Sequence, residues 1–184
     1  GCFYTSSFNI EINDDITYNL MTSSISCFNG NNGIIDISNI QGGIPPYFIS
    51  LTTGSNEYTS SYNNNLLAGD YILTITDNSD CNVSENIILT QNNEILFTIT
   101  QSYEQCYNNI EINALGGIPP YSYNIITPNI VYNSNSNFIG LYSDNIDRIF
   151  ITASVMDSLG CSTTKTFEIY GRTYEYSGSY CEQT

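Results

Sequence analysis

The chain contains no histidine and no tryptophan, and only three of its 184 residues are basic. Against 18 acidic residues, these three give a formal net charge of −15 at pH 7. Neutralising phosphate groups requires clustered lysine and arginine, so nucleic acid and anionic membrane surfaces are poor partners. The acidic residues are expected to form a solvated, self-repelling surface. No apolar run is long enough to span a bilayer, so we expect no membrane insertion in this segment.

The lack of histidine also argues against catalysis. At neutral pH, general acid–base chemistry usually employs histidine, a cysteine–histidine pair or two carboxylates in a cleft. The adjacent carboxylates Asp14 and Asp15 fall at an expected junction between repeats, where a solvated turn explains them. No Cys-x-x-Cys motif occurs, so zinc sites of the usual kinds are not expected either. We therefore predict that the chain is not an enzyme and has no cofactor.

A structural calcium ion is the alternative that the acidic residues leave open, because hard cations take oxygen ligands in loops. No Asp-x-Asp-x-Asp loop occurs, however. Capping of backbone NH groups in turns is a sufficient role for Asp77 and Asp157. The aspartates in predicted loops are Asp14, Asp15, Asp70, Asp77, Asp80, Asp144 and Asp147.

What the sequence does contain is an internal repeat. The hexapeptide Gly-Gly-Ile-Pro-Pro-Tyr occurs twice, at 42–47 and at 116–121. In each copy the glycines interrupt a strand, since positive φ costs glycine nothing, and the prolines restrict the backbone around them. The predicted structural turns consist of Gly42, Gly43, Pro45, Pro46 and Tyr47, and of Gly116, Gly117, Pro119, Pro120 and Tyr121.

The cysteines follow a similar period. Cys2, Cys81 and Cys161 recur at intervals of about 80 residues, and we call them the late cysteines. Cys27 and Cys106 have the same spacing, and we call them the early cysteines. Apolar residues alternate with polar ones after each late cysteine, and self-similarity at a fixed period indicates a repeat architecture. The sequence therefore predicts one unit of about 80 residues used in tandem.

The composition indicates strands, because the chain has 16 Tyr and 8 Phe and is rich in Ile and Thr. Turn residues recur at short intervals between stretches of alternating apolar and polar residues. About seven strands per unit are typical of an immunoglobulin-like β-sandwich, with a barrel as the lesser alternative. In the first repeat the expected strands are 15–20, 34–40, 47–51, 57–61, a short one near Leu66, 71–76 and 83–90.

The predicted fold class is all-β, with tandem immunoglobulin-like sandwiches in an elongated array. Two complete repeats are expected, at 13–91 and 92–171. Residues 1–12 are expected to be the C-terminal strand of a preceding repeat, and residues 172–184 the start of a following one.

The motifs resemble the SprB-type repeat of Bacteroidota surface adhesins. The first repeat matches at Cys27, 42–47, 66–71, Asp77 and Cys81. The second repeat keeps its cysteines, hexapeptide and Asp157, but it has other residues where the first has its Ala-Gly-x-Tyr step. The resemblance implies an extracellular multi-repeat adhesin or stalk exported by the type IX route. It implies no active site.

Single cysteines in a strand-rich, lysine-poor chain favour disulfides and an oxidising compartment. Cys27 precedes the second expected strand and Cys81 follows the penultimate one, which would place both at one end of a sandwich. We therefore predict the bonds Cys27–Cys81 and Cys106–Cys161, each stabilising by roughly 3–4 kcal/mol. The competing pairing is Cys81–Cys106, if the strands between them pair. The cysteines left without a partner in this segment are Cys2 and Cys181.

Three functions remain open. The preferred one is a segment of an extracellular surface adhesin, stalk or fibre that acts as a stiff, disulfide-stabilised spacer, because the expected linker near 90–95 is too short for a flexible coil. A self-assembling filament or virion-appendage subunit is the second. A ligand-binding ectodomain whose sandwich-end loops hold a glycan or protein is the third. Expected partners are neighbouring repeats of the same chain and surface glycans or proteins, and the expected localisation is the cell or virion surface.

Two further features bear on the surface. Asn82 begins the sequence Asn-Val-Ser, which makes it a candidate for glycosylation. Tyrosine in loops suits glycan or protein recognition, although filling half-buried strand faces is the ordinary role. The tyrosines in expected loops are Tyr58, Tyr62, Tyr103, Tyr107, Tyr174, Tyr176 and Tyr180.

Overall fold

The computed structural model describes residues 1–7, 14–104, 107–142 and 148–170. Over these residues the regular secondary structure consists of strands, and there is no helix that could cross a membrane. The chain forms two compact units. Unit 1 comprises Gly1–Ile25 and Asn29–Thr90, and unit 2 comprises Ser26–Phe28 and Gln91–Thr184. The predicted all-β class is confirmed.

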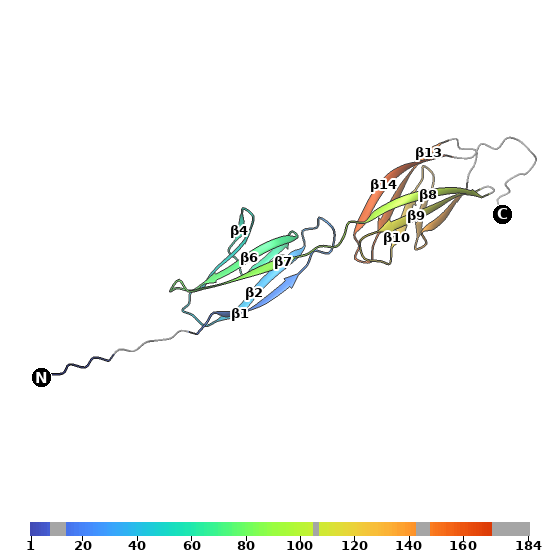
Figure 1. Ribbon diagram of the computed structural model, residues 1–184. Helices are drawn as coiled ribbons and strands as arrows, with labels where there is room; N and C mark the ends of the chain where they lie inside the picture. The colour runs from blue at the N-terminus through green and yellow to red at the C-terminus, as the bar shows by residue number, and fades with distance from the viewer. Residues whose placement is uncertain (8–13, 105–106, 143–147, 171–184) are drawn as a thin grey trace, which may run out of the picture. The chain divides into compact units, whose positions relative to one another are not determined.

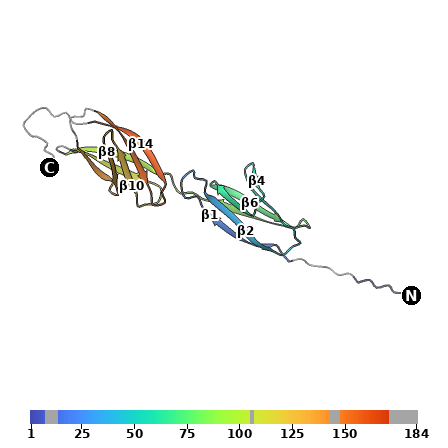
Figure 2. The same cartoon turned by 180° about the vertical axis from the view of Figure 1, so that it is seen from behind.

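Unit 1 is a sandwich of two antiparallel sheets, one ordered β1-β2-β5 and the other β4-β3-β6-β7. Figure 1 and Figure 2 show this unit from opposite sides, and in both views β1 and β2 form one layer and β4 and β6 the other. Its strands are β1 (Thr17–Ser23), β2 (Gly33–Gln41), β3 (Phe48–Thr53), β4 (Asn56–Tyr58), β5 (Tyr62–Leu66), β6 (Gly69–Thr76) and β7 (Asn82–Leu89).

Unit 2 repeats this arrangement strand for strand. Its sheets are ordered β12-β9-β8 and β11-β10-β13-β14, so each strand of unit 1 has a counterpart seven places later. The strands are β8 (Leu96–Glu104), β9 (Tyr107–Leu115), β10 (Ser122–Ile126), β11 (Val131–Ser134), β12 (Phe138–Tyr142), β13 (Ile149–Met156) and β14 (Ser162–Ile169). This shared strand order agrees with the repeat in the sequence.

Alternation along the strands places the core between the two sheets. In β6, Tyr71, Leu73 and Ile75 are buried while Ile72 is 49% exposed. They pack with Ile35 and other apolar residues of the facing sheet in one cluster. Unit 2 has a corresponding cluster of its own, in which β13 supplies three buried residues. Each fully buried Ile or Leu contributes about 1.5–3 kcal/mol, so each unit has a core sufficient for a small domain.

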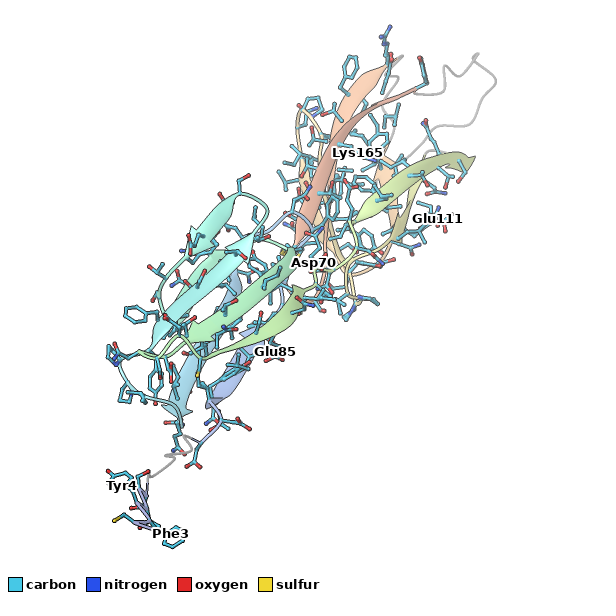
Figure 3. All side chains as sticks on the ribbon, turned by 60° about the vertical axis from the view of Figure 1, so that its left-hand side comes forward. Phe3, Tyr4, Asp70, Glu85, Glu111 and Lys165 are labelled. Atoms are coloured by element: carbon cyan, nitrogen blue, oxygen red, sulfur yellow. A yellow bond between two sulfur atoms is a disulfide. The ribbon has the colours of Figure 1, made fainter. Side chains whose placement is uncertain are left out.

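One edge of each sandwich is closed by a contact between its first and last strands. In unit 1 the hydroxyl of Tyr18 on β1 donates to Glu85 on β7 at 2.5 Å. In unit 2 the ammonium group of Lys165 on β14 lies 5.3 Å from the ring centroid of Phe97 on β8. Figure 3 labels Glu85 and Lys165, which occupy equivalent positions in the two units. In place of the hydrogen bond between side chains in unit 1, unit 2 thus has a cation–π contact together with a hydrogen bond from Lys165 to the carbonyl of Phe97 at 3.4 Å.

Candidate functional site

The hexapeptide forms a turn that leads into the third strand of each unit. Gly42 and Gly43 have φ of +76° and +57°, a region that L side chains rarely adopt. A Cβ atom on Gly42 would also collide with the backbone carbonyl of Asp15. The hydroxyl of Tyr47 donates to the Gly42 carbonyl at 2.6 Å, so the last residue of the motif holds its first. The Pro45–Pro46 peptide bond is cis.

The same turn recurs at the second copy. Gly116 and Gly117 have φ of +78° and +59°, and the hydroxyl of Tyr121 donates to the carbonyl of Gly116. The Pro119–Pro120 bond is again cis. The turn residues predicted from the motif therefore have the same structural role in both units.

A buried aspartate ties each hexapeptide to the turn before the last strand. One carboxylate oxygen of Asp77 accepts the backbone NH of Ile44 at 2.8 Å. The other accepts the NH groups of Ser79 and Cys81 at 2.8 and 2.9 Å. These hydrogen bonds, Ile44 first among them, hold the pKa of Asp77 below its ordinary value of 3.8, although burial acts in the opposite direction. Asp77 therefore joins the hexapeptide to the turn that contains the late cysteine.

Asp157 makes the same set of bonds in unit 2. It accepts the NH of Ile118 at 2.9 Å through one oxygen and those of Leu159 and Cys161 at 2.9 Å through the other. Its side chain is buried, as is that of Asp77. Of the late cysteines, Cys81 and Cys161 therefore lie in matching turns, each held by a carboxylate.

The disulfide that the structure contains joins Cys27 to Cys161. Cys27 lies in the three-residue segment Ser26–Phe28, which is part of unit 2 although the first sequence repeat contains it. The side-chain amide of Asn92 donates to the carbonyl of Ser26 at 2.7 Å. Cys27 itself packs against the core of unit 2. The segment is thus an integral part of the second unit.

The predicted bonds Cys27–Cys81 and Cys106–Cys161 are wrong, because Cys27 is bonded to Cys161 and Cys81 is a free, exposed thiol. The physical reason is the length of β7. Cys81 directly precedes that strand, whereas Ile25, two residues before Cys27, donates to the carbonyl of Thr90 just beyond its far end. Eight strand residues span about 26 Å, and a disulfide requires Cα atoms within about 7 Å.

The sequence also predicts that Cys2 and Cys181 have no disulfide partner in this segment. Cys2 is an exposed, free thiol, and its lack of a partner in this segment stays a prediction. Cys106 and Cys181 lie outside the described residues. The bonded pair is one that sequence reasoning missed. The common period of early and late cysteines is the signal that could have suggested it, since it makes Cys161 equivalent to Cys81.

The aspartates considered for calcium are dispersed. Asp14, Asp15 and Asp80 are exposed, and Asp77 is committed to backbone NH groups. Asp70, labelled in Figure 3, lies within β6 and not in the loop expected for it. Over the part of the chain that the structure describes, no three His, Cys, Asp or Glu side chains come together as metal ligands. Asp144 and Asp147 lie outside that part.

The tyrosines expected in loops lie largely in strands. Tyr58 belongs to β4, Tyr62 to β5, Tyr103 to β8 and Tyr107 to β9, which corrects the loop assignment. Tyr58 and Tyr62 were misjudged because the short strands β4 and β5 carry Asn, which is typical of loops. Asn82 is exposed at the start of β7, so its glycosylation stays a prediction. The tyrosines outside the described residues are Tyr174, Tyr176 and Tyr180.

A polar depression of about 480 Å³ lies on the outer face of the four-stranded sheet of unit 2. Hydroxyl and amide groups pair across its floor: Ser154 lies 2.8 Å from Thr164, and the amide of Asn124 donates to Asn133 at 2.7 Å. Met156 adds apolar surface, whereas Tyr123, which also borders the depression, is buried in the core. Neutral donors and acceptors suit an uncharged polar ligand such as a glycan. Most of the residues that line this depression lie on β10, β11, β13 and β14, and ligand binding by the sandwich-end loops stays a prediction.

Residues 19–56 match the model of the SprB repeat. This segment includes Cys27 and the first hexapeptide, and the match confirms the resemblance indicated by the motifs. The SprB repeat is a non-enzymatic, surface-adhesin-like repeat. Among curated proteins, none matches the chain.

Among solved structures, the chain is similar to the three N-terminal domains of the Highly Immunogenic Outer Capsid protein (Hoc) of bacteriophage RB49. The TM-score is 0.50 and the sequence identity is 14%. The similarity covers 85% of this chain and 59% of the phage chain. At this level of identity it concerns the fold alone, and it agrees with tandem immunoglobulin-like sandwiches.

Proposed function

We propose that the chain is a segment of an extracellular surface adhesin, stalk or fibre, and that its repeats act mainly as a stiff spacer. The observation that carries the proposal is that the bonded cysteines come from successive sequence repeats. Cys27 of the first repeat is covalently joined to Cys161 of the second, in addition to the peptide connection through Gln91. A second covalent connection restricts the freedom of one repeat with respect to the next.

Three further features support the same function. The two buried carboxylates of the described residues, Asp77 and Asp157, are committed to backbone NH groups of turns. The SprB repeat match supports a surface location, and disulfides persist in such an oxidising environment. The net charge of −15 keeps neighbouring chains apart in solution.

Small-angle scattering of the intact chain tests the spacer. A stiff spacer gives one elongated particle whose distance distribution stays constant, and Cys27→Ser, which removes the disulfide, broadens that distribution. A broad distribution for the unmodified, oxidised chain would refute stiffness. An identical distribution with and without the bond would refute the role assigned to the disulfide.

A second candidate function is binding of a surface glycan, and the polar depression on unit 2 favours it. Nuclear magnetic resonance titration with neutral oligosaccharides tests this function. Binding would shift amide signals of β10 and β13, and Ser154→Tyr, which fills the depression, would abolish the shifts. The corresponding change on unit 1, Thr74→Tyr, is the matched control because Thr74 also faces outward beside a hydroxyl, that of Ser84 at 3.3 Å. Absence of shifts with a broad oligosaccharide set would exclude this candidate.

A further inference from the structure

Cys81 occupies the same backbone setting as the bonded Cys161, yet its thiol is free. Each of the two cysteines donates its NH to an aspartate carboxylate at 2.9 Å, Cys81 to Asp77 and Cys161 to Asp157. Cys161 is only 9% exposed and bonded, whereas Cys81 is exposed and unbonded. The two cysteines therefore differ in exposure and bonding because a segment covers Cys161 and no described segment covers Cys81, while the turns that hold them are the same.

The cover over Cys161 is the segment Ser26–Phe28. Cys27 packs on the core of unit 2, and the Sγ of Cys161 lies 3.4 Å from the carbonyl oxygen of Ser26. By sequence this segment belongs to the first repeat and by contacts to unit 2. A late-cysteine turn is thus seen to accept the early-cysteine segment of the preceding repeat.

Unit 1 provides the equivalents of the residues beside that turn. In unit 2 the carbonyl of Asn93 accepts the NH of Gly117, and in unit 1 the carbonyl of Asp14 accepts the NH of Gly43 at 2.8 Å. Ile95 lies against Gly117, and Ile16 lies against Gly43 in the same way. Over the described residues, this part of the receiving surface is therefore arranged in unit 1 as it is in unit 2. The counterpart of Asn92 is Asn13, which lies outside the described residues.

We propose that Cys81 is a disulfide site whose partner is the early cysteine of a further repeat of this type. Two independent observations carry this assignment: the matching turn, and the bonded counterpart in the same chain. Each repeat would then use its late cysteine towards the preceding repeat and its early cysteine towards the following one. The inference deepens the proposed spacer function, and it rests on that function only in assuming that further repeats are present.

The bond forms by oxidation of two thiols. Cys81 and the partner cysteine together lose two protons and two electrons, and one sulfur–sulfur bond forms. A disulfide-bearing oxidant, such as oxidised glutathione, accepts those electrons and protons and leaves as two thiols. The attacking species is the thiolate, and an exposed position gives it access.

The test uses the intact chain and a synthetic peptide of residues 22–32, which contains Cys27. Chain and peptide equilibrate in a buffer of reduced and oxidised glutathione that leaves the Cys27–Cys161 bond intact. Peptide mapping by mass spectrometry then measures how much peptide is attached at Cys81 and at Cys2. Cys2 is the internal control because it is also a free, exposed cysteine. A peptide of the same composition in scrambled order is the second control.

We expect at least five times more peptide at Cys81 than at Cys2, and no such preference with the scrambled peptide. Equal attachment at the two thiols, or equal capture of the scrambled peptide, would overturn the proposal. A mixture of unlabelled and heavy-nitrogen-labelled chain without peptide distinguishes the sources of the partner. Disulfides between labelled and unlabelled chains at Cys81 identify a second copy as the partner, and their absence alongside selective peptide capture shows that the partner is an early-cysteine segment outside this chain. The small-angle scattering test of the spacer function does not involve Cys81. A negative peptide-capture result therefore leaves the spacer function standing, and a negative scattering result leaves the assignment of Cys81 standing.

Discussion

Replacement of Cys161 by serine removes the only bonded late cysteine of the described chain and tests how unit 2 is stabilised. The disulfide joins residues that are 134 positions apart, but the loop that it closes on unfolding of unit 2 is shorter. The NH of Ile25 donates to the carbonyl of Thr90 at 2.9 Å, so folded unit 1 holds the ends of its own segment together. The flexible loop then runs from Gln91 to Cys161, about 70 residues, and the chain-entropy relation gives about 4 kcal/mol for it.

A loss of this size is most of the stability of a small domain, because whole domains are stable by only about 5–15 kcal/mol. A unit of this length loses about 2 kcal/mol of unfolding free energy per molar guanidinium. The unfolding midpoint of unit 2 should therefore fall by roughly 2 M in the Cys161→Ser variant. Unit 1 should unfold at an unchanged denaturant concentration, since its core contains neither bonded cysteine.

Hydrogen exchange followed by mass spectrometry measures the two units separately through peptides from β13 and β6. Cys81→Ser is the matched control, because it changes the equivalent residue of a turn with the same hydrogen bonds but breaks no disulfide. That variant should differ from the unmodified chain by no more than about 0.5 kcal/mol. A loss below about 1 kcal/mol in Cys161→Ser, or an equal loss in both variants, would refute the loop-closure reasoning.

Three further outcomes are expected. Burial and Glu85 raise the pKa of Tyr18 to about 12. Unit 1 should therefore lose stability as pH rises above 10 towards 12. Tyr18→Phe should lessen that loss, which is measured as the difference between the urea unfolding midpoints at about pH 9 and about pH 11. The pKa of Asp77 is lowered in the folded chain, so its contribution to the stability of unit 1 is complete above pH 3.8 and is lost as pH falls below that value. Asp77→Asn should therefore weaken the dependence of the unfolding temperature of unit 1 on pH in the acid range. An unchanged dependence would contradict this. Gly54 has φ +54° and open space around it, so Gly54→Ala should destabilise unit 1 by about 1–2 kcal/mol, measured by chemical denaturation. Gly42→Ala should destabilise unit 1 by more, because the new Cβ atom would also collide with the backbone of Asp15.

The strands of the first repeat could be predicted because their signals are local. Alternation identified all seven, with ends that differ from the observed ones by a few residues, and the buried face of β6 follows from the spacing of Tyr71, Leu73 and Ile75. The turn role of the hexapeptide is likewise local, since only glycine adopts φ near +76° readily and the Tyr47 hydroxyl reaches back five residues. Asp77 was assigned a capping role, and its bonds to Ser79 and Cys81 are of that kind.

Features that depend on two distant segments could not be predicted in the same way. The edge contact is Tyr18 with Glu85 in unit 1 and Phe97 with Lys165 in unit 2. No local sequence pattern predicts either contact, because the two residues come together only when the first and last strands of a sandwich meet. The polar depression of unit 2 is similar in origin. Its floor combines residues of β10, β11, β13 and β14, and serine or asparagine in any one of them is unremarkable alone.

The disulfide shows why a periodic sequence is ambiguous for long-range pairing. Moving from Cys81 to Cys161 advances the chain by one period and reaches an equivalent turn, so the pattern of spacings alone fits a bond from Cys27 to either one. Only the three-dimensional direction of the strands decides between them. Because β7 carries the chain away from Cys81 to the end where Ile25 meets Thr90, Cys27 is out of reach of the turn in its own repeat and within reach of the turn in the next. The disulfide thus joins the early cysteine of one repeat to the late cysteine of the next, whereas each unit folds largely from the residues of a single repeat. A substitution at an early cysteine should consequently destabilise the unit that follows it and not the unit whose sequence contains it.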